Sequence, residues 1–374
     1  MPKKKILLLY AAPDSGHAQA AHAVVEAIKR HSDWDAAEDN VIRYFPHLGG
    51  LFLKLYHWMI ANHSGVWGRM HDNPELYPLV RQAEGLLYDQ DIFKLRQMLE
   101  RHRPDAVIST HALPIRILAG AKSRGRLDTP LFGVTTDFWA HRYWASVSVD
   151  RYFASSKQAA DDLARHGVDA GRIETTGIPL RGQFLRPPAK AAACRRLKLD
   201  PKKPSVMVMG GSLGLLPFDE LLSAAQSKGS PSSWQWLFVL GGNEEALRRV
   251  KSLRKPEHAG RIRIYGFEDN IVSLMSAADC LITKGGALTA AEALAVNCPL
   301  IIHRPIPGQE EGNARLLVKA GAALREDQLD GVLRSAALLF RSPSRLANMR
   351  EAARKIARPQ AALDIVKALK ESLR

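Results

Sequence analysis

The chain has 374 residues, of which 46% are hydrophobic and 24% charged. This composition excludes a disordered, collagen-like or coiled-coil protein, and the length is sufficient for two hydrophobic cores. Its formal net charge of +15 is uneven: residues 184–374 hold 30 Lys and Arg against 18 Asp and Glu, which favours an anionic partner such as a nucleotide diphosphate, a membrane surface or nucleic acid. The three scattered cysteines, Cys194, Cys280 and Cys298, argue against disulfides or a zinc site and favour a reducing cytoplasm.

The first apolar run, Ile6–Ala12, follows three lysines and predicts a buried strand. It is too short to cross a bilayer, no small-residue cleavage site follows it, and no other segment reaches about 18 uncharged apolar residues. We therefore expect neither a signal peptide nor a transmembrane helix. A Ser/Gly turn and a histidine, His17, come directly after this strand, and a helical pattern begins there.

Strand and helix patterns alternate almost throughout the chain, which predicts an α/β protein with parallel sheets. Short apolar runs predict strands at 5–11, 105–109, 131–135, 151–154, 205–209, 236–241, 262–264, 279–283 and 299–303. Helical patterns include 18–31, 91–102, 156–166, 288–296 and 310–320.

The Pro-rich and basic stretch 184–204 interrupts this alternation and is predicted to be a linker, the alternative being a long surface loop in one domain. It separates an N-terminal domain, 1–183, from a C-terminal domain, 205–357. A basic helix at 358–374 is expected to end the chain.

Two segments suggest contact with a membrane. The stretch 48–71 carries Phe52 and Tyr56 at helical spacing with Trp58 nearby, and it predicts either a buried core helix or an interfacial helix that reaches lipid headgroups. The segment 331–374 has ten Lys and Arg against three Asp and Glu, which favours an anionic bilayer.

Two glycine-rich turns in the C-terminal half follow predicted strands. "VMVMGGSLG" (206–214) includes Gly211 and Ser212, and glycines of this kind let backbone N–H groups approach a phosphate, although the turn matches neither a Walker A loop nor the dinucleotide fingerprint. "LITKGGALTAAEAL" (281–294) includes Gly286, Thr289 and Glu292. The last two form either a capping box or contacts to a phosphate and to ribose hydroxyls.

A third turn, "PIPGQEEGNARLLVKAG" (305–321), places Gln309, Glu310 and Asn313 at the start of a helix. Side chains with both donors and acceptors suit a sugar, and ordinary surface polarity explains each one equally well. Asp89 and Asp91 match an Asp-x-Asp metal pattern, but they occupy a helical stretch away from these turns, so no essential metal is expected.

These motifs together resemble the monogalactosyldiacylglycerol synthase and processive diacylglycerol glucosyltransferase family, relatives of the enzyme that adds N-acetylglucosamine to lipid I. The resemblance covers nearly the whole chain and includes "SGHAQAAHAVVEAI" (15–28), "VTTDFWAHRYW" (134–144), "DRYFASSKQAADDLARHGV" (150–168), "TTGIPLRGQF" (175–184), "GGSLG" (210–214), "TKGGALTAAEAL" (283–294) and "IPGQEEGNARLLVKAGAA" (306–323). It implies a GT-B fold, in which two facing Rossmann-like domains with parallel sheets enclose a cleft. The N-terminal domain would take the acceptor and the C-terminal domain the nucleotide-diphosphate sugar.

The resemblance also assigns roles to the donor-side residues. It places Gly211 and Ser212 at the diphosphate, Phe267 of "YGFEDNI" near the uracil and Glu292 at the ribose. Gln309 and Glu310 would bind the sugar.

On the acceptor side, the resemblance makes His17 the candidate general base. A neutral imidazole at the start of a helix can accept a proton near pH 7, and a capping or packing histidine is the alternative. Asp137, Arg142 and Trp144 are expected to line the acceptor entry.

We therefore expect an inverting hexosyltransferase that uses a UDP-hexose and diacylglycerol, without a cofactor, as a peripheral protein on the cytoplasmic side of the membrane. Transfer to another lipid-linked or polyprenyl acceptor is one alternative, and a nucleotide-sugar 2-epimerase is another. Nucleic-acid binding is suggested by charge alone, and no basic–aromatic recognition motif supports it.

Overall fold

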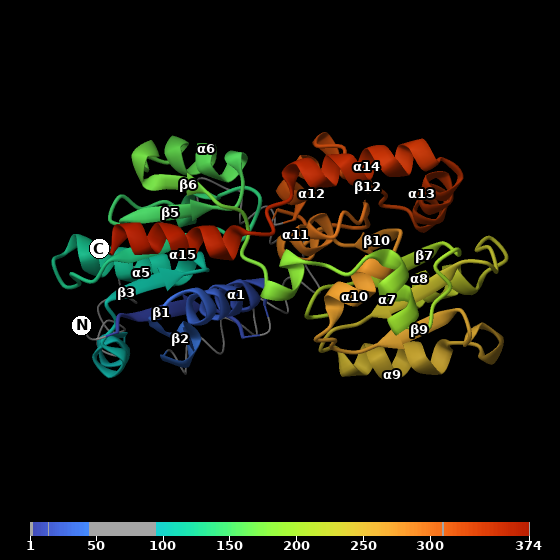
Figure 1. Ribbon diagram of the computed structural model, residues 1–374, viewed down its shortest axis with the longest axis horizontal. Helices are drawn as coiled ribbons and strands as arrows, with labels where there is room; N and C mark the ends of the chain where they lie inside the picture. The colour runs from blue at the N-terminus through green and yellow to red at the C-terminus, as the bar shows by residue number, and fades with distance from the viewer. Residues whose placement is uncertain (1–2, 14, 45–94, 309, 374) are drawn as a thin grey trace. The chain divides into compact units, whose positions relative to one another are not determined.

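The computed structural model describes residues 3–13, 15–44, 95–308 and 310–373 (Figure 1). Several predicted features lie outside these described residues: Phe52, Tyr56, Trp58, Asp89, Asp91 and Gln309.

The chain divides into two units. The N-terminal unit consists of Met1–Gly182 and Gln360–Arg374 together with Pro307–Gln309, and the C-terminal unit consists of Gln183–Ile306 and Glu310–Pro359. The main chain therefore passes to the C-terminal unit after Gly182 and returns at Gln360.

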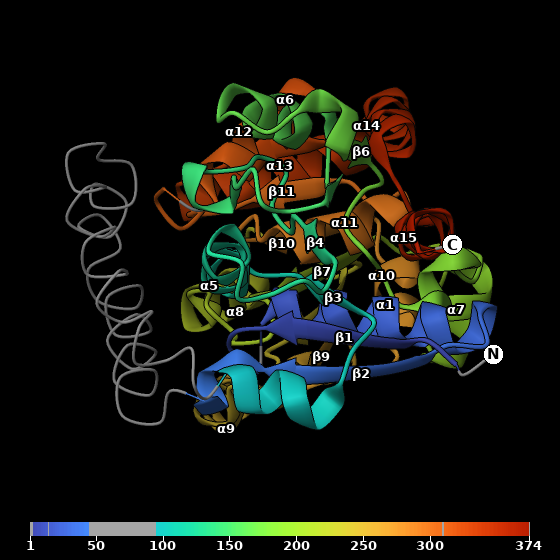
Figure 2. The same ribbon diagram turned by 90° about the vertical axis from the view of Figure 1, so that its left-hand side faces the viewer.

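The N-terminal unit contains a six-stranded parallel sheet in the order β2-β1-β3-β4-β5-β6. Its strands are β1 (Lys5–Tyr10), β2 (Asp35–Asn40), β3 (Ala106–Ser109), β4 (Leu131–Val134), β5 (Arg151–Ala154) and β6 (Ile173–Thr175). Strand β1 runs between β2 and β3 (Figure 2). In the register of these strands, Leu7 lies opposite Ala37 of β2 and Val107 of β3.

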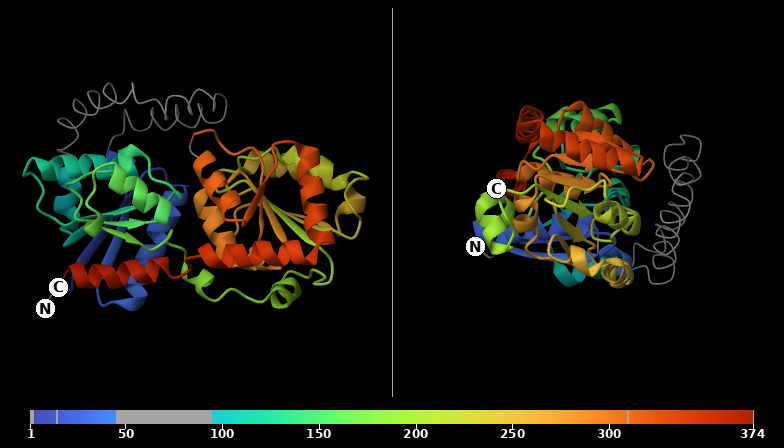
Figure 3. Two further views of the ribbon diagram at one scale, coloured as in Figure 1. Left: turned by 90° about the horizontal axis from the view of Figure 1, so that it is seen from above. Right: turned by 90° about the vertical axis from the view of Figure 1, so that its right-hand side faces the viewer.

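Helices cover both faces of this sheet because alternate strand residues point to opposite sides. Ile6 and Leu8 of β1 pack in one core cluster with residues of α1 (Gly16–His31) and α15 (Ala361–Ser372). Leu7 and Leu9 pack in the other with residues of α5 (Ala112–Ser123) and α6 (Lys157–Arg165). Figure 3 (left) shows the last helix, in red, running along the N-terminal unit.

The C-terminal unit has a second six-stranded parallel sheet, in the order β12-β11-β10-β7-β8-β9. Its strands are β7 (Ser205–Met209), β8 (Gln235–Val239), β9 (Ile262–Tyr265), β10 (Cys280–Thr283), β11 (Leu300–Ile302) and β12 (Ala323–Arg325). Its helices are α7 (Lys190–Arg196), α8 (Phe218–Gln226), α9 (Glu244–Leu253), α10 (Ile271–Ala277), α11 (Ala287–Ala295), α12 (Glu311–Lys319), α13 (Leu329–Arg341) and α14 (Pro343–Ile356). One core cluster contains residues of β7, β8, α8, α9 and α13.

The predicted parallel α/β architecture is confirmed, and all nine predicted strands are present. Three further strands, β2, β6 and β12, were not predicted. Each lies at the edge of its sheet, where a strand does not need apolar residues on both faces; β2 has the sequence DAAEDN.

Two predictions about the ends of the units need correction. The expected linker 184–204 contains α7, which packs against α10 within the C-terminal unit, and Lys190 Nζ lies 2.6 Å from an Asp279 carboxylate oxygen. The expected basic helix at 358–374 corresponds to α15, whose apolar face, including Ile365 and Leu369, is buried in the N-terminal unit. Among the described residues, no helix has both the length and the apolar character that crossing a bilayer requires.

Each sheet has one place where the strand order reverses. In the N-terminal unit the chain moves outward from β1 to β2 and then returns to the other side of β1 as β3. In the C-terminal unit it moves from β7 out to β9 and returns beside β7 as β10. In open α/β sheets ligands bind beyond the carboxyl ends of the strands at such switch points, so the β1/β3 and β7/β10 ends are where a site is expected.

Candidate functional site

His17 lies at the switch point of the N-terminal unit. Strand β1 ends at Tyr10, and Ser15 caps α1 by accepting a hydrogen bond from the backbone N–H of Ala18 at 3.4 Å. The Ser15 hydroxyl donates to the carbonyl oxygen of Ala12 at 2.6 Å, and Ala12 adopts a left-handed backbone with φ of 63°. This tight turn places His17 in the first turn of α1, at the carboxyl end of the sheet.

The contacts of His17 determine its tautomer. Its Nδ1 lies 2.9 Å from the carbonyl oxygen of Thr110, which follows β3, and 2.6 Å from the hydroxyl of Thr136, which follows β4. A carbonyl oxygen can only accept a hydrogen bond, so Nδ1 carries the ring proton and donates a hydrogen bond to the carbonyl oxygen of Thr110. In the neutral ring Nε2 therefore has a free lone pair, and His17 is equipped to accept a proton.

Burial also keeps the His17 ring neutral. Loss of solvation is the largest effect and lowers the pKa of His17, while the negative charge of Asp137 and the hydrogen bond to Thr110 act in the opposite direction. Asp137 lies in the loop after β4, and the hydroxyl of Ser155 donates to its carbonyl oxygen and holds that loop in place. The ring is thus uncharged near pH 7, with a carboxylate close enough to stabilise it once it is protonated.

A second histidine, His111, lies beside His17 and is not among the residues predicted from the sequence. The two ring centres are 4.5 Å apart and the rings are nearly perpendicular, at 78°. His111 follows β3 and caps α5 by accepting the backbone N–H of Leu113 on Nδ1 at 3.0 Å. The signal was present, because a strand, a histidine and a helical run occur in the same order as around His17.

The three residues predicted to line the acceptor entry differ in their distance from His17 and in their exposure. Asp137 lies close enough to His17 to influence its pKa, and Arg142 is exposed. The prediction for Trp144 is wrong: its side chain is only 1% exposed and belongs to the core beneath α5. The carbonyl oxygen of Trp144 also accepts a hydrogen bond of 2.6 Å from the Tyr152 hydroxyl, which fixes this turn internally.

The glycine-rich turn after β7 is at the switch point of the C-terminal unit. Gly211 has φ of 75°, and its carbonyl oxygen accepts the N–H of Gly214 at 3.1 Å. The turn packs on the neighbouring β8–α9 turn, where the carbonyl oxygen of Ser212 accepts the N–H of Gly242 at 2.8 Å. A Cβ atom on Gly214 would lie 2.3 Å from the carbonyl oxygen of Leu240, so a side chain there is excluded.

The helix that can bind an anion at this switch point is α11, not α8. Helix α8 begins only at Phe218 and has Asp219 and Glu220 in its first turn, which disfavour a phosphate. Helix α11 begins directly after the β10 turn, with Gly286 as its N-cap, no side-chain cap and no acidic residue in its first turn. Its first backbone N–H groups are therefore suited to a phosphate.

This geometry also rules out the capping-box interpretation of Thr289 and Glu292. The N-cap is Gly286, and Thr289 is the third residue inside the helix, where it is buried. Glu292 lies one turn further along and is partly exposed.

Lys284 is a second site residue that was not predicted from the sequence. It follows β10, its ammonium group pairs with the carboxylate of Glu310, and its side chain is 14% exposed. Its Cε would lie 3.5 Å from a Cβ on Gly211, so Lys284 bridges the two glycine-rich turns. A lysine between a buried strand and two glycines was the signal in the sequence.

The remaining donor-side residues differ in accessibility. Phe267 follows β9 and is 57% exposed, which suits a ring that stacks on a base. Glu310 is only 4% exposed, and besides pairing with Lys284 it accepts the N–H of Ile306 at 3.0 Å, so it holds its own turn in place. Asn313 is completely buried within α12.

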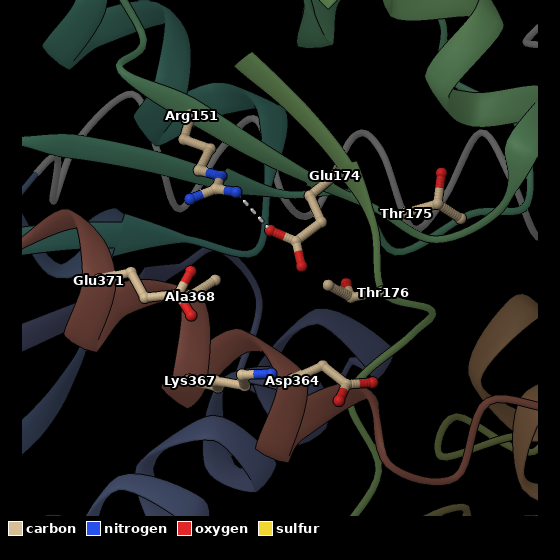
Figure 4. Close-up of a pocket in the computed structure, with 8 residues that line it drawn as sticks. All are labelled: Arg151, Glu174, Thr175, Thr176, Asp364, Lys367, Ala368 and Glu371. Carbon is tan, nitrogen blue, oxygen red and sulfur yellow. Dashed lines mark ion pairs between the residues drawn. The ribbon is translucent and has the colours of Figure 1, made fainter. Parts of the chain in front are cut away.

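A polar pocket of about 200 Å³ lies elsewhere in the N-terminal unit, between the β5–β6 edge and α15 (Figure 4). Arg151 and Glu174 form an ion pair of 2.7 Å in this pocket, and Lys367 and Asp364 of α15 line it as well. It contains none of the predicted site residues, and its charges largely compensate one another.

Comparison with known protein families divides the chain near the first boundary of the structure, after Gly182, although the second match extends into α15, which belongs to the N-terminal unit. Residues 17–180 match the family monogalactosyldiacylglycerol (MGDG) synthase, and residues 205–365 match the glycosyltransferase family 28 C-terminal domain.

Similar curated proteins cover nearly the full length. A processive diacylglycerol beta-glucosyltransferase of Bacillus cereus is 29% identical over 98% of this chain and 93% of its own, and one of Bacillus subtilis is 25% identical over 93% and 90%. Among solved structures, S. aureus MnaA with UDP has a TM-score of 0.64 at 16% identity over 99% of this chain and 97% of its own. Acinetobacter baumannii MurG has a TM-score of 0.63 at 17% identity over 99% and 100%. These likenesses show that the fold is of the GT-B kind, with two Rossmann-like domains.

Proposed function

Since this chain belongs to the monogalactosyldiacylglycerol synthase family over its N-terminal domain and to glycosyltransferase family 28 over its C-terminal domain, we propose that it transfers a hexose from a UDP-sugar to diacylglycerol with inversion at C1. The similar curated proteins are named as diacylglycerol glucosyltransferases, which supports both the acceptor and the reaction class. The observation that carries the proposal is the free Nε2 lone pair of His17 at the switch point of the family's N-terminal domain.

In the proposed reaction the acceptor hydroxyl donates its hydrogen bond to Nε2 of His17. Its oxygen attacks C1 of the sugar from the face opposite UDP, so the new C1–O bond forms as the bond from C1 to the phosphate oxygen breaks. The hydroxyl proton moves to Nε2, and the bonding pair leaves with UDP. Asp137 stabilises the imidazolium that results, because its charge favours the protonated ring.

The leaving diphosphate gains negative charge, and the C-terminal unit supplies groups to bind it. We assign the backbone amides of Gly211 and Ser212, the first turn of α11 after Gly286, and the ammonium of Lys284 to this role. The Lys284 ammonium has three donors, so pairing with Glu310 leaves it able to bind a phosphate oxygen.

The rest of the donor is assigned to neighbouring side chains. The exposed ring of Phe267 stacks on the uracil, and Glu292 accepts from the ribose hydroxyls. Replacing Glu292 with Ala is expected to raise the KM for the UDP-sugar and to weaken UDP itself, because this contact exists before and during the reaction.

We further propose peripheral attachment to an anionic bilayer. The apolar face of α15 is part of the protein core, so on this helix only the exposed side chains, such as Lys367, remain for lipid headgroups. Attachment through charge is screened by salt, and pelleting with anionic liposomes should be reversed at high ionic strength. Equal pelleting with neutral liposomes would contradict this part of the proposal.

The decisive test is an assay of the purified protein with a panel of UDP-sugars and diacylglycerol in anionic micelles. Lipid products are identified by mass spectrometry, and the anomeric configuration is read by NMR. A β-linked glycolipid from an α-linked donor is expected. Retention at C1 would overturn the mechanism, and interconversion of the UDP-sugar without a lipid product would favour a 2-epimerase.

A further inference from the structure

His111 has the opposite tautomer to His17. Its Nδ1 accepts the backbone N–H of Leu113, so Nδ1 carries no proton, and in the neutral ring the proton is on Nε2. Burial, with smaller contributions from His17 and His141, holds the pKa of His111 well below its ordinary value, so the ring is neutral at pH 7.

The backbone around His111 is held by local hydrogen bonds. The Ser109 hydroxyl donates to the carbonyl oxygen of His111 at 2.8 Å, and it accepts the N–H of His111 at 3.3 Å. Together with the hydrogen bond from the Leu113 N–H to Nδ1, these contacts restrict a 180° flip of the His111 ring. In the described part of the chain, the Nε2 hydrogen of His111 has no protein acceptor among its hydrogen bonds.

The two neighbouring rings therefore present different chemistry. His17 presents an accepting Nε2, and His111 presents an Nε2–H donor, on rings whose centres are 4.5 Å apart. A ligand that carries a hydroxyl donor and, on the adjacent carbon atom, an oxygen acceptor has the chemistry that complements one accepting and one donating nitrogen on neighbouring rings, each through a hydrogen bond of about 2.8–3.0 Å.

We infer that His111 is an acceptor-binding residue that donates from Nε2 to an oxygen on the carbon next to the one bearing the reacting hydroxyl. This inference rests on the proposed function and makes it more specific. In 1,2-diacylglycerol the required oxygen is the ester oxygen at the central carbon. The site thereby selects acceptors with two vicinal oxygens over simple long-chain alcohols.

The test separates this role from helix capping with two substitutions. His111→Asn keeps an acceptor near the position of Nδ1 and preserves the cap, but it removes the Nε2–H donor. His111→Gln keeps a donor near the position of Nε2 and loses the cap. Rates are measured with dioleoylglycerol and with mono-oleoyl-1,3-propanediol, which has no oxygen on the carbon next to its hydroxyl, in the same mixed micelles.

We expect His111→Asn to lower kcat/KM for dioleoylglycerol roughly tenfold and to leave the propanediol ester unchanged. His111→Gln should keep the preference for dioleoylglycerol while its melting temperature falls, because the amide of Leu113 loses its partner. Equal losses for both acceptors in His111→Asn, or no loss for either, would overturn the inference while leaving the transferase activity established.

Histidine NMR on the unliganded protein gives a readout that does not depend on activity. The ¹⁵N shifts should show His17 protonated at Nδ1 and His111 at Nε2, and dioleoylglycerol micelles should shift the His111 Nε2 signal. If the wild-type protein transfers no sugar, the proposed function fails, and this titration still decides whether His111 binds the lipid. An Nδ1–H tautomer for His111, or a signal unmoved by the lipid, contradicts the inference.

Discussion

Replacing His17 with Asn removes the proposed base and changes little else. The Asn amide N–H₂ can still donate to the carbonyl oxygen of Thr110, which His17 Nδ1 contacts at 2.9 Å, whereas the Nε2 lone pair is lost. A positioned general base contributes about 10²–10⁴ in rate, which corresponds to roughly 3–5 kcal/mol of transition-state stabilisation. We expect kcat to fall by that factor and UDP affinity to stay the same, because the groups assigned to UDP belong to the C-terminal unit.

The pH dependence of the wild-type rate should also show that a neutral His17 is required. Only the neutral ring accepts a proton, so the rate falls as the pH drops through the pKa of His17. Burial lowers that pKa, so the decline should begin below the ordinary histidine value of about 6.5. The residual activity of His17→Asn should lack this decline at low pH, the acidic limb of the profile.

Initial rates with a radiolabelled UDP-hexose, UDP binding by calorimetry and thermal unfolding complete the comparison. A variant that keeps its melting temperature and its UDP affinity but loses turnover supports the assignment. Turnover within about threefold of wild type, or an unchanged acidic limb, would refute the reasoning.

Other predictions test the donor side and the stability of the two units. Lys284→Met should weaken UDP binding by about tenfold or more, since a charge-assisted hydrogen bond contributes roughly 1.5–3 kcal/mol; unchanged affinity by calorimetry would remove Lys284 from the site. Gly214→Ala should lower the melting temperature markedly, because its Cβ would lie 2.3 Å from a carbonyl oxygen, while Gly260→Ala, with nothing within 4 Å, serves as the matched control. Stability should also decrease as the pH falls below about 6.5, because His111 has a lowered pKa in the folded state and the unfolded chain binds the proton more readily. Denaturant unfolding at pH 7 and pH 5 checks this, and His111→Asn should show the smaller difference between the two.

The central strands of both sheets were predictable because they are buried on both faces. β1 and β7 read as continuous apolar runs, and the alternation with helices then required parallel sheets. The edge strands β2, β6 and β12 were not predictable in this way. β12 has only three residues, one of them buried, and its pairing with β11 rather than its own residues defines it.

The positions of some site residues at the carboxyl ends of the sheets were predictable, but His111 and Lys284, which follow the central strands β3 and β10, were missed. Prediction also failed where burial decides. His17 and Gly211 come from the turns after β1 and β7, and the switch-point geometry places such turns at the carboxyl ends of the sheets. Trp144 was wrongly predicted, because the sequence motif does not distinguish an aromatic ring that faces a substrate from one that is buried in the core. The pairing of Lys284 with Glu310 joins positions 26 residues apart, and no local pattern reports it.

The return of the chain to its N-terminal unit has a consequence for synthesis on the ribosome. Ile365 and Leu369 of α15 fill a core whose other members, such as Ile6 and Val24, are translated before the C-terminal unit. Domains generally fold as they emerge, in order from the N-terminus. Here the first unit to be made is the last to be completed, because its final core helix leaves the ribosome only after the whole C-terminal unit has been translated. Nascent residues 1–182 must therefore wait with one face of their sheet incompletely covered, and a premature stop before codon 361 would leave that face open in every molecule.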